Sequence, residues 1–351
     1  MESWSLTFNA FSFLVAAVVI WRAGTRLEFL ADKISRRTGL GQAFTGMLLL
    51  AAATSLPEVA TTVTAVASLG NANLAVHNLL GGVAMQTTIL VFADATMRRH
   101  GSLTFFSPTF ALLVQGVGVV LLLQIAIAGI TAKGLPEFHS VSLWVVLLVF
   151  AYVGTTYLVY RDRGQPRWTP SRRDDVPPEV REKQEEAEDD GAETRDDESP
   201  WLAFAGMSLV VLAGGWWATR TAEVLAEQTG LGEAFLGATL LATATSLPEV
   251  STTFAAVRND RYTVAISNIF GSNAFDVMLL ALADILHREG TILASTAGTE
   301  VFIAAIGSIL TCLFVWGLIE RENRIVLRIG WDSVAAVLVY VGGMTVLFFL
   351  S

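Results

Sequence analysis

Thiols are almost absent from this chain of 351 residues, which has a single cysteine, Cys312. One cysteine cannot form an intramolecular disulfide, and a metal site built of several thiolates is excluded as well. Charge is also scarce, because Asp, Glu, Lys and Arg together make up 16 % of the residues while 53 % are hydrophobic. The mean hydropathy is +0.55. A soluble domain carries far more charge, so the composition indicates a polytopic membrane protein.

The charge that is present gathers in one segment. Residues 161–200 hold 14 of the 32 acidic and 8 of the 23 basic residues, a local net charge of −6 out of −9. This segment is rich in proline and small polar residues and cannot bury enough apolar surface to fold. We therefore expect residues 161–199 to form an acidic, disordered linker. A solvated tether is the preferred interpretation, and an acidic sensor that collects Ca²⁺ is the alternative.

Long apolar runs fill the rest of the chain. No basic segment precedes the first of them, which starts at Leu6, so we expect no cleavable signal peptide. Ten runs are long enough to cross a bilayer, at residues 6–31, 40–67, 73–97, 104–130, 140–160, 200–226, 232–257, 262–286, 298–319 and 328–350. Five precede the linker and five follow it, which divides the chain into halves at 1–160 and 200–351. An odd number of spans per half inverts the second half relative to the first.

Basic residues in the short loops predict the orientation, because they gather on the cytoplasmic side. With the N-terminus outside, the inside loops carry Lys33, Arg36, Arg37, Arg98, Arg99, Arg258, Arg261, Arg321, Arg324 and Arg328. The outside loops carry only Lys133, Arg220 and Arg288. We therefore expect both termini outside and the linker in the cytoplasm.

A six-residue segment, TSLPEV, occurs at residues 54–59 and again at 245–250. Its surroundings repeat too: GLGQAFTG (39–46) matches GLGEAFLG (230–237), and NLLGGVAMQ (78–86) matches NIFGSNAFD (268–276). Each copy places a glutamate within an apolar run. An acid inside a membrane helix is costly and marks a functional site, so the repeats near 39–86 and 230–276 indicate a transporter with one site shared between its halves.

The residues around each glutamate offer oxygen ligands. Thr54 and Glu58 are four residues apart and share a helix face, with Ala51 three residues before Thr54 on that face. Pro57 lacks an N–H, so it frees the carbonyl of Ala53 and kinks the helix. The second copy repeats this set as Ala242, Thr245, Ser246, Pro248 and Glu249, and the first copy also contains Ser55.

Freed carbonyls, hydroxyls and carboxylates form an oxygen-only pocket, which suits hard cations such as Ca²⁺ or Na⁺ rather than soft metals. Two carboxylates that meet in the membrane repel each other unless cations or protons compensate them. The empty site should therefore reorient mainly when it is occupied, which is the physical basis of exchange. If the stretch 268–276 is helical, Ser272 and Asp276 face the same pocket, since they too are four residues apart.

The paired TSLPEV segments, each followed by an N-x-x-G-[SG] stretch, resemble the alpha repeats of the sodium/calcium exchanger branch of the calcium:cation antiporter superfamily. The resemblance covers essentially all of the transmembrane sequence. It implies an all-α polytopic membrane protein with ten transmembrane helices as two inverted five-helix repeats. It also implies that the calcium ligands are the side chains of Glu58 and Glu249 and the backbones of Thr54 and Thr245. The implied sodium ligands are Ala51, Ser55, Ala242, Ser246 and Ser272, and Asp276 matches a polar position of the family.

The first repeat departs from the family pattern at two positions. Gly82 stands where the family usually has serine, so one expected sodium ligand is missing. Gln86 stands where the family usually has asparagine or aspartate and is the counterpart of Asp276. The counter-ion is therefore open between Na⁺ and H⁺.

The expected function is secondary active antiport of Ca²⁺ against Na⁺ across a prokaryotic plasma membrane. The alternatives are H⁺-coupled antiport of Ca²⁺ or another divalent cation, because buried carboxylates can carry protons, and, more distantly, a cation channel. We expect no enzyme and no prosthetic group. The partners are inorganic cations and the lipid bilayer, without nucleic acid, and the sequence indicates no oligomeric state.

Three further polar residues have two interpretations each. Asp94 and Asp284 match across the halves, near helix ends, and either guide ions toward the site or act as caps at the interface. His77 is either a proton relay that lines the pore or a histidine hydrogen-bonded between helices, and the second is favoured.

Overall fold

The computed structural model describes residues 5–68, 70, 72–97, 101–107, 109–132, 137–138, 141–162, 199–229, 243–287, 290–295, 298–321, 323–326 and 328–350. Expectations about the other residues lie outside the described part of the chain. These are mainly the linker segment 163–198 and the segment 230–242, which includes Ala242.

The first half consists of helices, joined at one point by a minimal hairpin. Its elements are α1 (Leu6–Thr38), α2 (Gln42–Phe44), the π-helical η1 (Thr45–Leu50), α3 (Ala51–Thr54), α4 (Leu56–Val63), the π-helical η2 (Thr64–Ser68), α5 (Ala72–Ala95), α6 (Leu103–Phe106), α7 (Phe110–Thr131), β1 (Glu137–Phe138), β2 (Val141–Ser142) and α8 (Leu143–Asp162).

The second half repeats this order. Its described elements are α10 (Pro200–Thr229), α12 (Leu247–Arg258), α13 (Tyr262–Leu286), α14 (Ile292–Ser295), α15 (Gly298–Glu320), β3 (Ile325–Val326), β4 (Ile329–Gly330) and α16 (Trp331–Leu350). The short helices α6 and α14 occupy corresponding places, and so do the antiparallel hairpins β1–β2 and β3–β4. The sequence predicted helices alone, and the two-residue strands are the one addition.

Eight described helices are long and apolar enough to cross a membrane, and a bent pair, Gln42–Thr54 with Leu56–Ser68, adds a ninth span. These nine match nine of the ten predicted spans. The tenth, predicted at 232–257, is described only from residue 243, where α12 supplies its second part. The predicted span 104–130 is divided into α6 and α7. Pro108 lies between them in the sequence, and a proline disfavours helical geometry in the residue before it.

Helix α1 is longer than predicted. It continues past residue 31 to Thr38, so Lys33, Arg36 and Arg37 lie on a helix rather than in a loop. The helix ends where Gly39 takes a left-handed conformation with φ of 65° and its N–H bonds to the Ser35 carbonyl. Helix α1 is therefore longer than its apolar run, because its charged last turns can extend beyond the hydrocarbon layer of the membrane.

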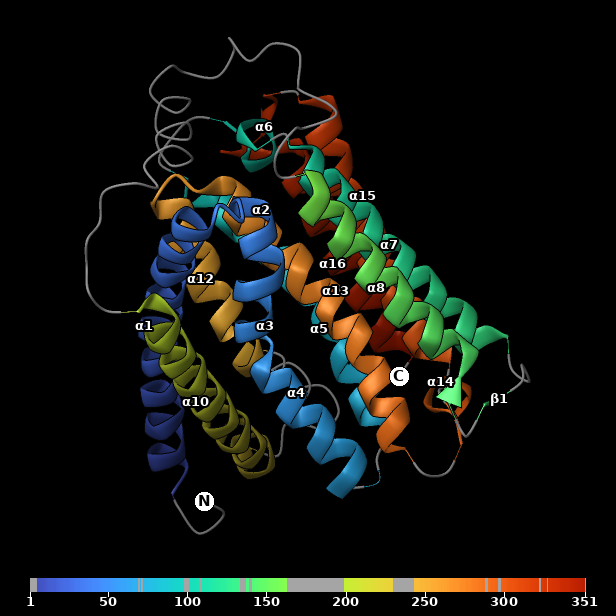
Figure 1. The fold of residues 1–351 in the computed structure, drawn as a ribbon. Coiled ribbons are helices and arrows are strands. Elements are labelled where there is room, and N and C mark those ends of the chain that lie inside the picture. The colour runs from blue at the N-terminus through green and yellow to red at the C-terminus, as the bar shows by residue number, and fades with distance from the viewer. Residues whose placement is uncertain are drawn as a thin grey trace.

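The helices form three groups (Figure 1). Helices α1 and α10 pack closely against each other on one side of the molecule. Helices α7, α8, α15 and α16 form the opposite side, and α5 and α13 lie between them. The broken helix α3–α4 and α12 lie next to the pair of α1 and α10, so both TSLPEV segments are inside the bundle.

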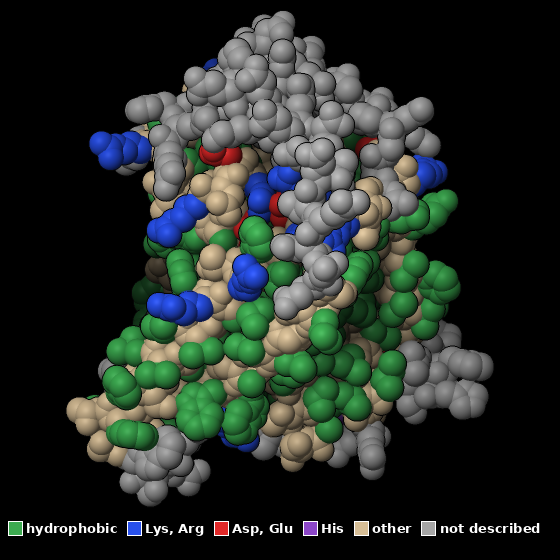
Figure 2. Space-filling view, turned by 60° about the vertical axis from the view of Figure 1, so that its left-hand side comes forward, with side chains coloured by type: hydrophobic (Ala, Val, Ile, Leu, Met, Phe, Trp, Pro, Cys, Tyr) green, Lys and Arg blue, Asp and Glu red, His purple; other side chains and the backbone are tan. Residues whose placement is uncertain are grey.

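Large apolar side chains cover much of the outer surface. Phe11, Phe150, Leu202 and Phe349 are 63 %, 71 %, 79 % and 80 % exposed, respectively. Figure 2 shows a broad band of hydrophobic side chains on one face, with most of the drawn Lys and Arg side chains toward one end of it. Such a surface is unfavourable in water and suits a bilayer.

Two matched carboxylates join the halves at opposite ends. Asp94, near the end of α5, accepts hydrogen bonds from Leu103 N at 2.8 Å, Gly330 N at 2.7 Å and Ser333 Oγ at 2.7 Å. Asp284, near the end of α13, accepts from Ile292 N at 2.7 Å and Ser142 N at 3.1 Å. Each carboxylate thus caps a short helix of its own half and holds the hairpin of the other half. This geometry supports the capping interpretation over ion guidance.

Candidate functional site

Both TSLPEV segments lie where a helix begins anew. The helix of the first half ends at Thr54, bends by 44° and restarts at Leu56, with Ser55 between the two parts. Pro57 lies in the first turn of the new helix, where its missing N–H costs nothing because that position has no helical acceptor. In the second half, Ser246 precedes α12 in the same way, and Pro248 lies in its first turn. The predicted kink is thus a break that places each glutamate at a helix N-terminus, where a negative charge is favourable.

The acids of the two segments are buried together. Glu58, Glu249 and Asp276 are 2 %, 0 % and 0 % exposed. The carboxylate of Glu58 is close enough to those of Glu249 and Asp276 for electrostatic repulsion. Thr245 lies beside Glu58, and Thr54 lies beside Glu249. Each threonine is therefore next to the glutamate of the other half, so the two repeats interlock at this point.

Ser272 connects the two halves through its hydroxyl. Its Oγ is 3.3 Å from Thr54 Oγ1 of the first half and donates to Glu249 Oε1 of the second at 3.4 Å. Thr54 Oγ1 in turn donates to the Ala51 carbonyl at 3.2 Å. Four of the predicted ligands, Ala51, Thr54, Glu249 and Ser272, thus form one continuous chain of oxygen atoms.

The corresponding residues Gln86 and Asp276 meet directly. Gln86 Nε2 donates to Asp276 Oδ2 at 2.9 Å, and both side chains are fully buried. Asp276 is also adjacent to Ser55. A Cβ on Gly82 would be 3.7 Å from Asp276 Oδ2 and 3.8 Å from Gln86 Nε2, so this position opens toward the same pair. The helix positions that match across the repeat therefore face each other across the centre of the molecule.

Several buried oxygen atoms of this cluster have no hydrogen-bond partner of good geometry among the residues that the structure describes. They are both carboxylate oxygens of Glu58, Glu249 Oε2, Asp276 Oδ1, Gln86 Oε1 and the hydroxyls of Ser55 and Ser246. Orphaned buried oxygens cost free energy, the more so when they are charged, and a cation satisfies such acceptors. Among the described residues, no three His, Cys, Asp or Glu side chains are arranged as a metal centre of their own. A cation here must therefore be held by carboxylates together with hydroxyl and carbonyl oxygens, which is the ligand set that Ca²⁺ and Na⁺ accept.

The structure brings ten of the eleven predicted site residues into or next to this cluster. The contacts above include Ala51, Thr54, Ser55, Glu58, Gln86, Thr245, Glu249, Ser272 and Asp276, and Ser246 is the buried neighbour of Thr245 in sequence. Ala242 lies outside the described residues.

Two further polar pairs lie close to the glutamates and were not predicted as site residues. Asn78 Nδ2 donates to Thr61 Oγ1 at 3.3 Å, and the matching Asn268 Nδ2 donates to Thr252 Oγ1 at 2.9 Å. Each threonine follows its glutamate by three residues and donates back to the glutamate carbonyl, at 3.0 Å in the first half and 3.1 Å in the second. These pairs stabilise the helix just after each glutamate. The sequence could have indicated them, since the threonines and the asparagines repeat at matching places.

Glycines let α1 and α10 approach the two prolines. A Cβ on Gly215 of α10 would be 2.4 Å from Pro57 Cγ, and a Cβ on Gly24 of α1 would be 1.8 Å from Ser251 Oγ and 3.3 Å from the Pro248 carbonyl oxygen. Each helix of the pair therefore contacts the TSLPEV segment of the other half. A movement of α1 and α10 would therefore displace the residues at both helix breaks.

A pocket lies between the first half and α10. It is lined by Ala60, Thr61, Thr64, Ala65, Leu74, Ala75, Asn78, Trp216, Thr219 and Arg220. Thr61 connects this pocket to the backbone of Glu58. His77 lies next to Asn78 in sequence, and its Nδ1 is 3.2 Å from Glu300 Oε1 of α15, which supports a histidine bonded between helices.

Comparisons with known proteins agree over nearly the whole chain. The family model described as "Sodium/calcium exchanger protein" matches residues 8–161 and 199–349. The putative antiporter CaxA of Alkalimonas amylolytica is 25 % identical over 329 residues, which cover 91 % of this chain and 94 % of that protein. The inner membrane protein YrbG of Escherichia coli strain K12 is 26 % identical over 318 residues, covering 89 % and 90 %.

The fold is shared with a protein of known structure. The sodium-calcium exchanger NCX_Mj, soaked with 10 mM Na⁺ and no Ca²⁺, superposes with a TM-score of 0.68 at 17 % identity and covers 97 % of this chain and 99 % of its own. This likeness supports the arrangement of all the helices as two repeats, including the broken helix.

Proposed function

This chain belongs to the sodium/calcium exchanger protein family, and we propose that it exchanges Ca²⁺ for Na⁺ across the plasma membrane by alternating access. The family is one of membrane cation antiporters rather than enzymes. The finer statements, namely the coupling ion, the ligand residues and the membrane side of each end, are our proposals. The similarity to an inner membrane protein supports the plasma membrane as the location.

The observation that carries this proposal is the meeting of Glu58 and Glu249 at two helix breaks, each beside the threonine of the other half. Together with Asp276 they bury three carboxylates, and several of their oxygens have no protein donor. An empty site of this kind keeps uncompensated charge out of water, which is unfavourable. A bound Ca²⁺ or several Na⁺ ions compensate the charge, so the loaded forms are the ones that change conformation. This coupling of occupancy to movement is what makes exchange obligatory.

We assign the ligands to the residues of this cluster. Calcium is held by the carboxylates of Glu58 and Glu249 and the backbone oxygens of Thr54 and Thr245. Sodium is held by oxygens of Ala51, Ser55, Ser246 and Ser272, with Ala242 as the expected counterpart of Ala51. The buried Ser55 and Ser246 hydroxyls, which have no hydrogen-bond partner of good geometry among the described residues, support this assignment.

Proton coupling is the second candidate, and two residues favour it. Gly82 offers no hydroxyl, and Gln86 offers an amide that is already bonded to Asp276. The first half therefore has fewer oxygens for a monovalent cation than the second. A channel is the more distant alternative. A fixed site between two broken helices of opposite orientation suits alternating access better than an open pore.

The test is flux of labelled Ca²⁺ into proteoliposomes that contain the purified chain. A Na⁺ gradient at equal pH and a pH gradient without Na⁺ are imposed separately. We expect saturable Ca²⁺ uptake with the Na⁺ gradient, and uptake with the pH gradient alone would establish the proton-coupled alternative. The Glu58→Gln/Glu249→Gln variant is the control, because it keeps the shape and removes two charges. Gradient-driven uptake that persists in this variant would contradict the assigned site.

A further inference from the structure

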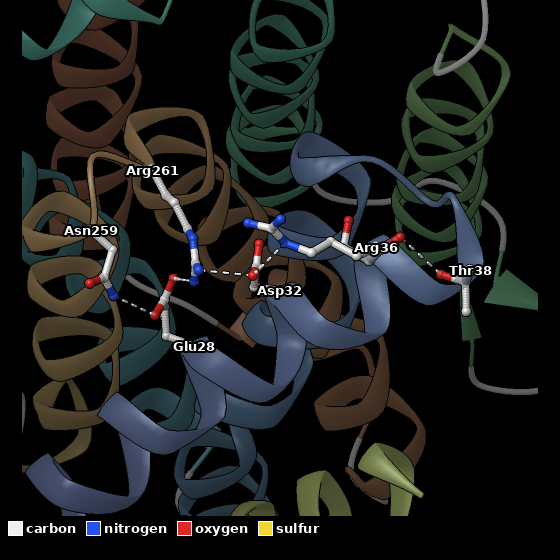
Figure 3. A network of polar contacts seen from close by, with 7 residues as sticks. Glu28, Asp32, Arg36, Thr38, Asn259 and Arg261 are labelled. Carbon is white, nitrogen blue, oxygen red and sulfur yellow. Dashed lines mark hydrogen bonds and ion pairs between the residues drawn. The ribbon is translucent and has the colours of Figure 1, made fainter. Parts of the chain in front are cut away.

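A network of charged side chains ties α1 to the turn between α12 and α13 (Figure 3). Arg261 of the turn donates from Nη1 to Glu28 Oε1 at 2.7 Å and pairs through Nη2 with Asp32 Oδ2 at 2.8 Å. Asn259 Nδ2 donates to Glu28 Oε2 at 3.2 Å, and Arg36 Nε pairs with Asp32 Oδ2 at 2.9 Å. We call these five residues the charged network.

The centre of the charged network, Glu28, Asp32 and Arg261, is largely shielded from solvent, whereas Asn259 is exposed and the side chain of Arg36 is 26 % exposed. Glu28 and Asp32 are 1 % and 9 % exposed, and the side chain of Arg261 is 15 % exposed. An ion pair at this depth is weakened little by solvent, and the loss of one partner leaves the other as a buried, unpaired charge. To move α1 away from the turn, the protein must separate Arg261 from the carboxylates of Glu28 and Asp32 and break the hydrogen bond from Asn259. The charged network therefore opposes any movement of α1 at this end.

The pocket beside α10 lies toward the other end of the same helix pair. Trp217, next to the pocket residue Trp216, donates from Nε1 to Ser12 Oγ at 2.7 Å, near the start of α1. Glu28 is 16 residues further along α1, which corresponds to about 24 Å at 1.5 Å per residue. One end of the pair is thus tied by charge, and the other end borders a pocket whose lining residue Thr61 donates a hydrogen bond to the Glu58 carbonyl.

The inverted repeat predicts a matching tie at the pocket end, but the sequence provides only part of it. The acids of residues 28–32 (EFLAD) recur in α10 at residues 223–227 (EVLAE). The matching of 78–86 with 268–276 makes Asn71 the counterpart of Arg261. Both helices carry the acids, and only the turn between α12 and α13 carries the arginine. The matched segments are therefore unequal in sequence, since asparagine replaces the arginine in the first half.

We propose that the charged network is a one-sided latch, which closes the site toward the α12–α13 end and favours the conformation that opens beside α10. By the predicted orientation, this end is cytoplasmic and the resting antiporter faces outward. The proposal rests on the alternating access described above. In this proposal the network is broken in the other conformation, so it shifts the equilibrium toward the conformation described here by its net interaction free energy. Exchange then has an intrinsic bias set by Arg261 and independent of the bound ion.

The test measures access to the pocket directly. In a Cys312→Ser background, Thr64→Cys places a thiol in the pocket wall, and a membrane-impermeant maleimide is applied to intact cells. We expect Arg261→Gln to lower the labelling rate severalfold, because fewer molecules are open on that side. Arg258→Gln is the matched control, since it removes the same charge from an exposed side chain beside the same turn, and it should label like the parent. Ala132→Cys, at the exposed end of α7, reports labelling that is independent of conformation.

Two milder variants cover the case in which Arg261→Gln does not fold. Glu28→Gln removes one charge of the network, and Asn259→Ala removes one hydrogen bond and no charge. We expect both to lower the labelling of Thr64→Cys, Glu28→Gln by the larger factor. Unchanged or faster labelling in every folded variant of the network overturns the latch. Labelling requires no transport, so an absence of Ca²⁺ exchange would contradict the proposed function and leave this result intact.

Discussion

At the scale of single residues, the asymmetry between the repeats is concentrated in two pairs of matched positions. Ser272 shares its hydroxyl between Thr54 and Glu249, while its counterpart Gly82 has none. Asp276 can carry a charge, while its counterpart Gln86 donates a hydrogen bond to it. A site with two matched motifs thus has ligands of unequal number on its two sides. Counter-ion binding should depend on the second half more than on the first.

We predict that Gly82→Ser raises the apparent affinity for Na⁺ severalfold and that Ser272→Ala lowers it by at least as much. An added serine fits, because a Cβ at position 82 meets Asp276 Oδ2 and Gln86 Nε2 at ordinary contact distances. One extra oxygen at an incompletely satisfied site is worth on the order of 1 kcal/mol. The measurement is the half-maximal Na⁺ concentration for Ca²⁺ release from loaded vesicles at fixed pH. If neither variant moves this value while external pH changes the rate strongly, the counter-ion is H⁺.

The residues around the breaks were predictable because their signal is local and doubled. A proline next to a glutamate in an apolar run, present twice, indicates both the helix break and the shared site without any knowledge of the packing. The contact of Gln86 with Asp276 was not predictable in the same way, because it depends on how two distant helices cross. The charged network was not predicted for a similar reason. Arg261 was interpreted as a loop charge, and only the packing of α1 brings Glu28 and Asp32 to it.

At the scale of elements, the pair of α1 and α10 is fitted to the two breaks by small side chains. Gly215 lies against Pro57, and Gly24 lies against Ser251 and the Pro248 carbonyl. Neither contact leaves room for a methyl group. The helix ends were the least predictable part of these elements, as α1 shows, because its last turn is held by the charged network and the Gly39 cap rather than by an apolar pattern.

We predict that Gly215→Ala impairs exchange while Gly206→Ala on the same helix does not. A Cβ at position 215 overlaps Pro57 Cγ at 2.4 Å, and such overpacking costs roughly 1–3 kcal/mol or forces α10 away from α4. No atom lies within 4 Å of a Cβ at position 206, and alanine favours the helix there. Initial rates of Ca²⁺ uptake and the thermal stability in detergent are measured for both. Equal rates in the two variants would mean that α10 does not need close contact with the break.

At the scale of the whole molecule, the two halves are held together by direct hydrogen bonds between them. Asp94 of the first half binds Gly330 and Ser333 of the second, and Asp284 of the second binds Ser142 of the first. The site itself interlocks the halves through Thr54, Ser272 and Glu249. The halves are thus held together by hydrogen bonds at both ends of the molecule and at its centre. These contacts do not require the linker.

We therefore predict that the acidic linker is dispensable for transport. Replacing residues 174–198 by a neutral flexible tether of equal length should leave the transport rate within a factor of about two, since such a tether has a root-mean-square span of about 30 Å and still joins the halves. The variant also removes 13 of the 32 acidic residues of the chain, so it tests the alternative of a Ca²⁺ sensor at the same time. Exchange rates are compared with the parent in proteoliposomes over a range of Ca²⁺ on the linker side. If the linker is a sensor, the variant loses a Ca²⁺ dependence or most of its activity. If it is a simple tether, the exchange rates of variant and parent depend on Ca²⁺ in the same way.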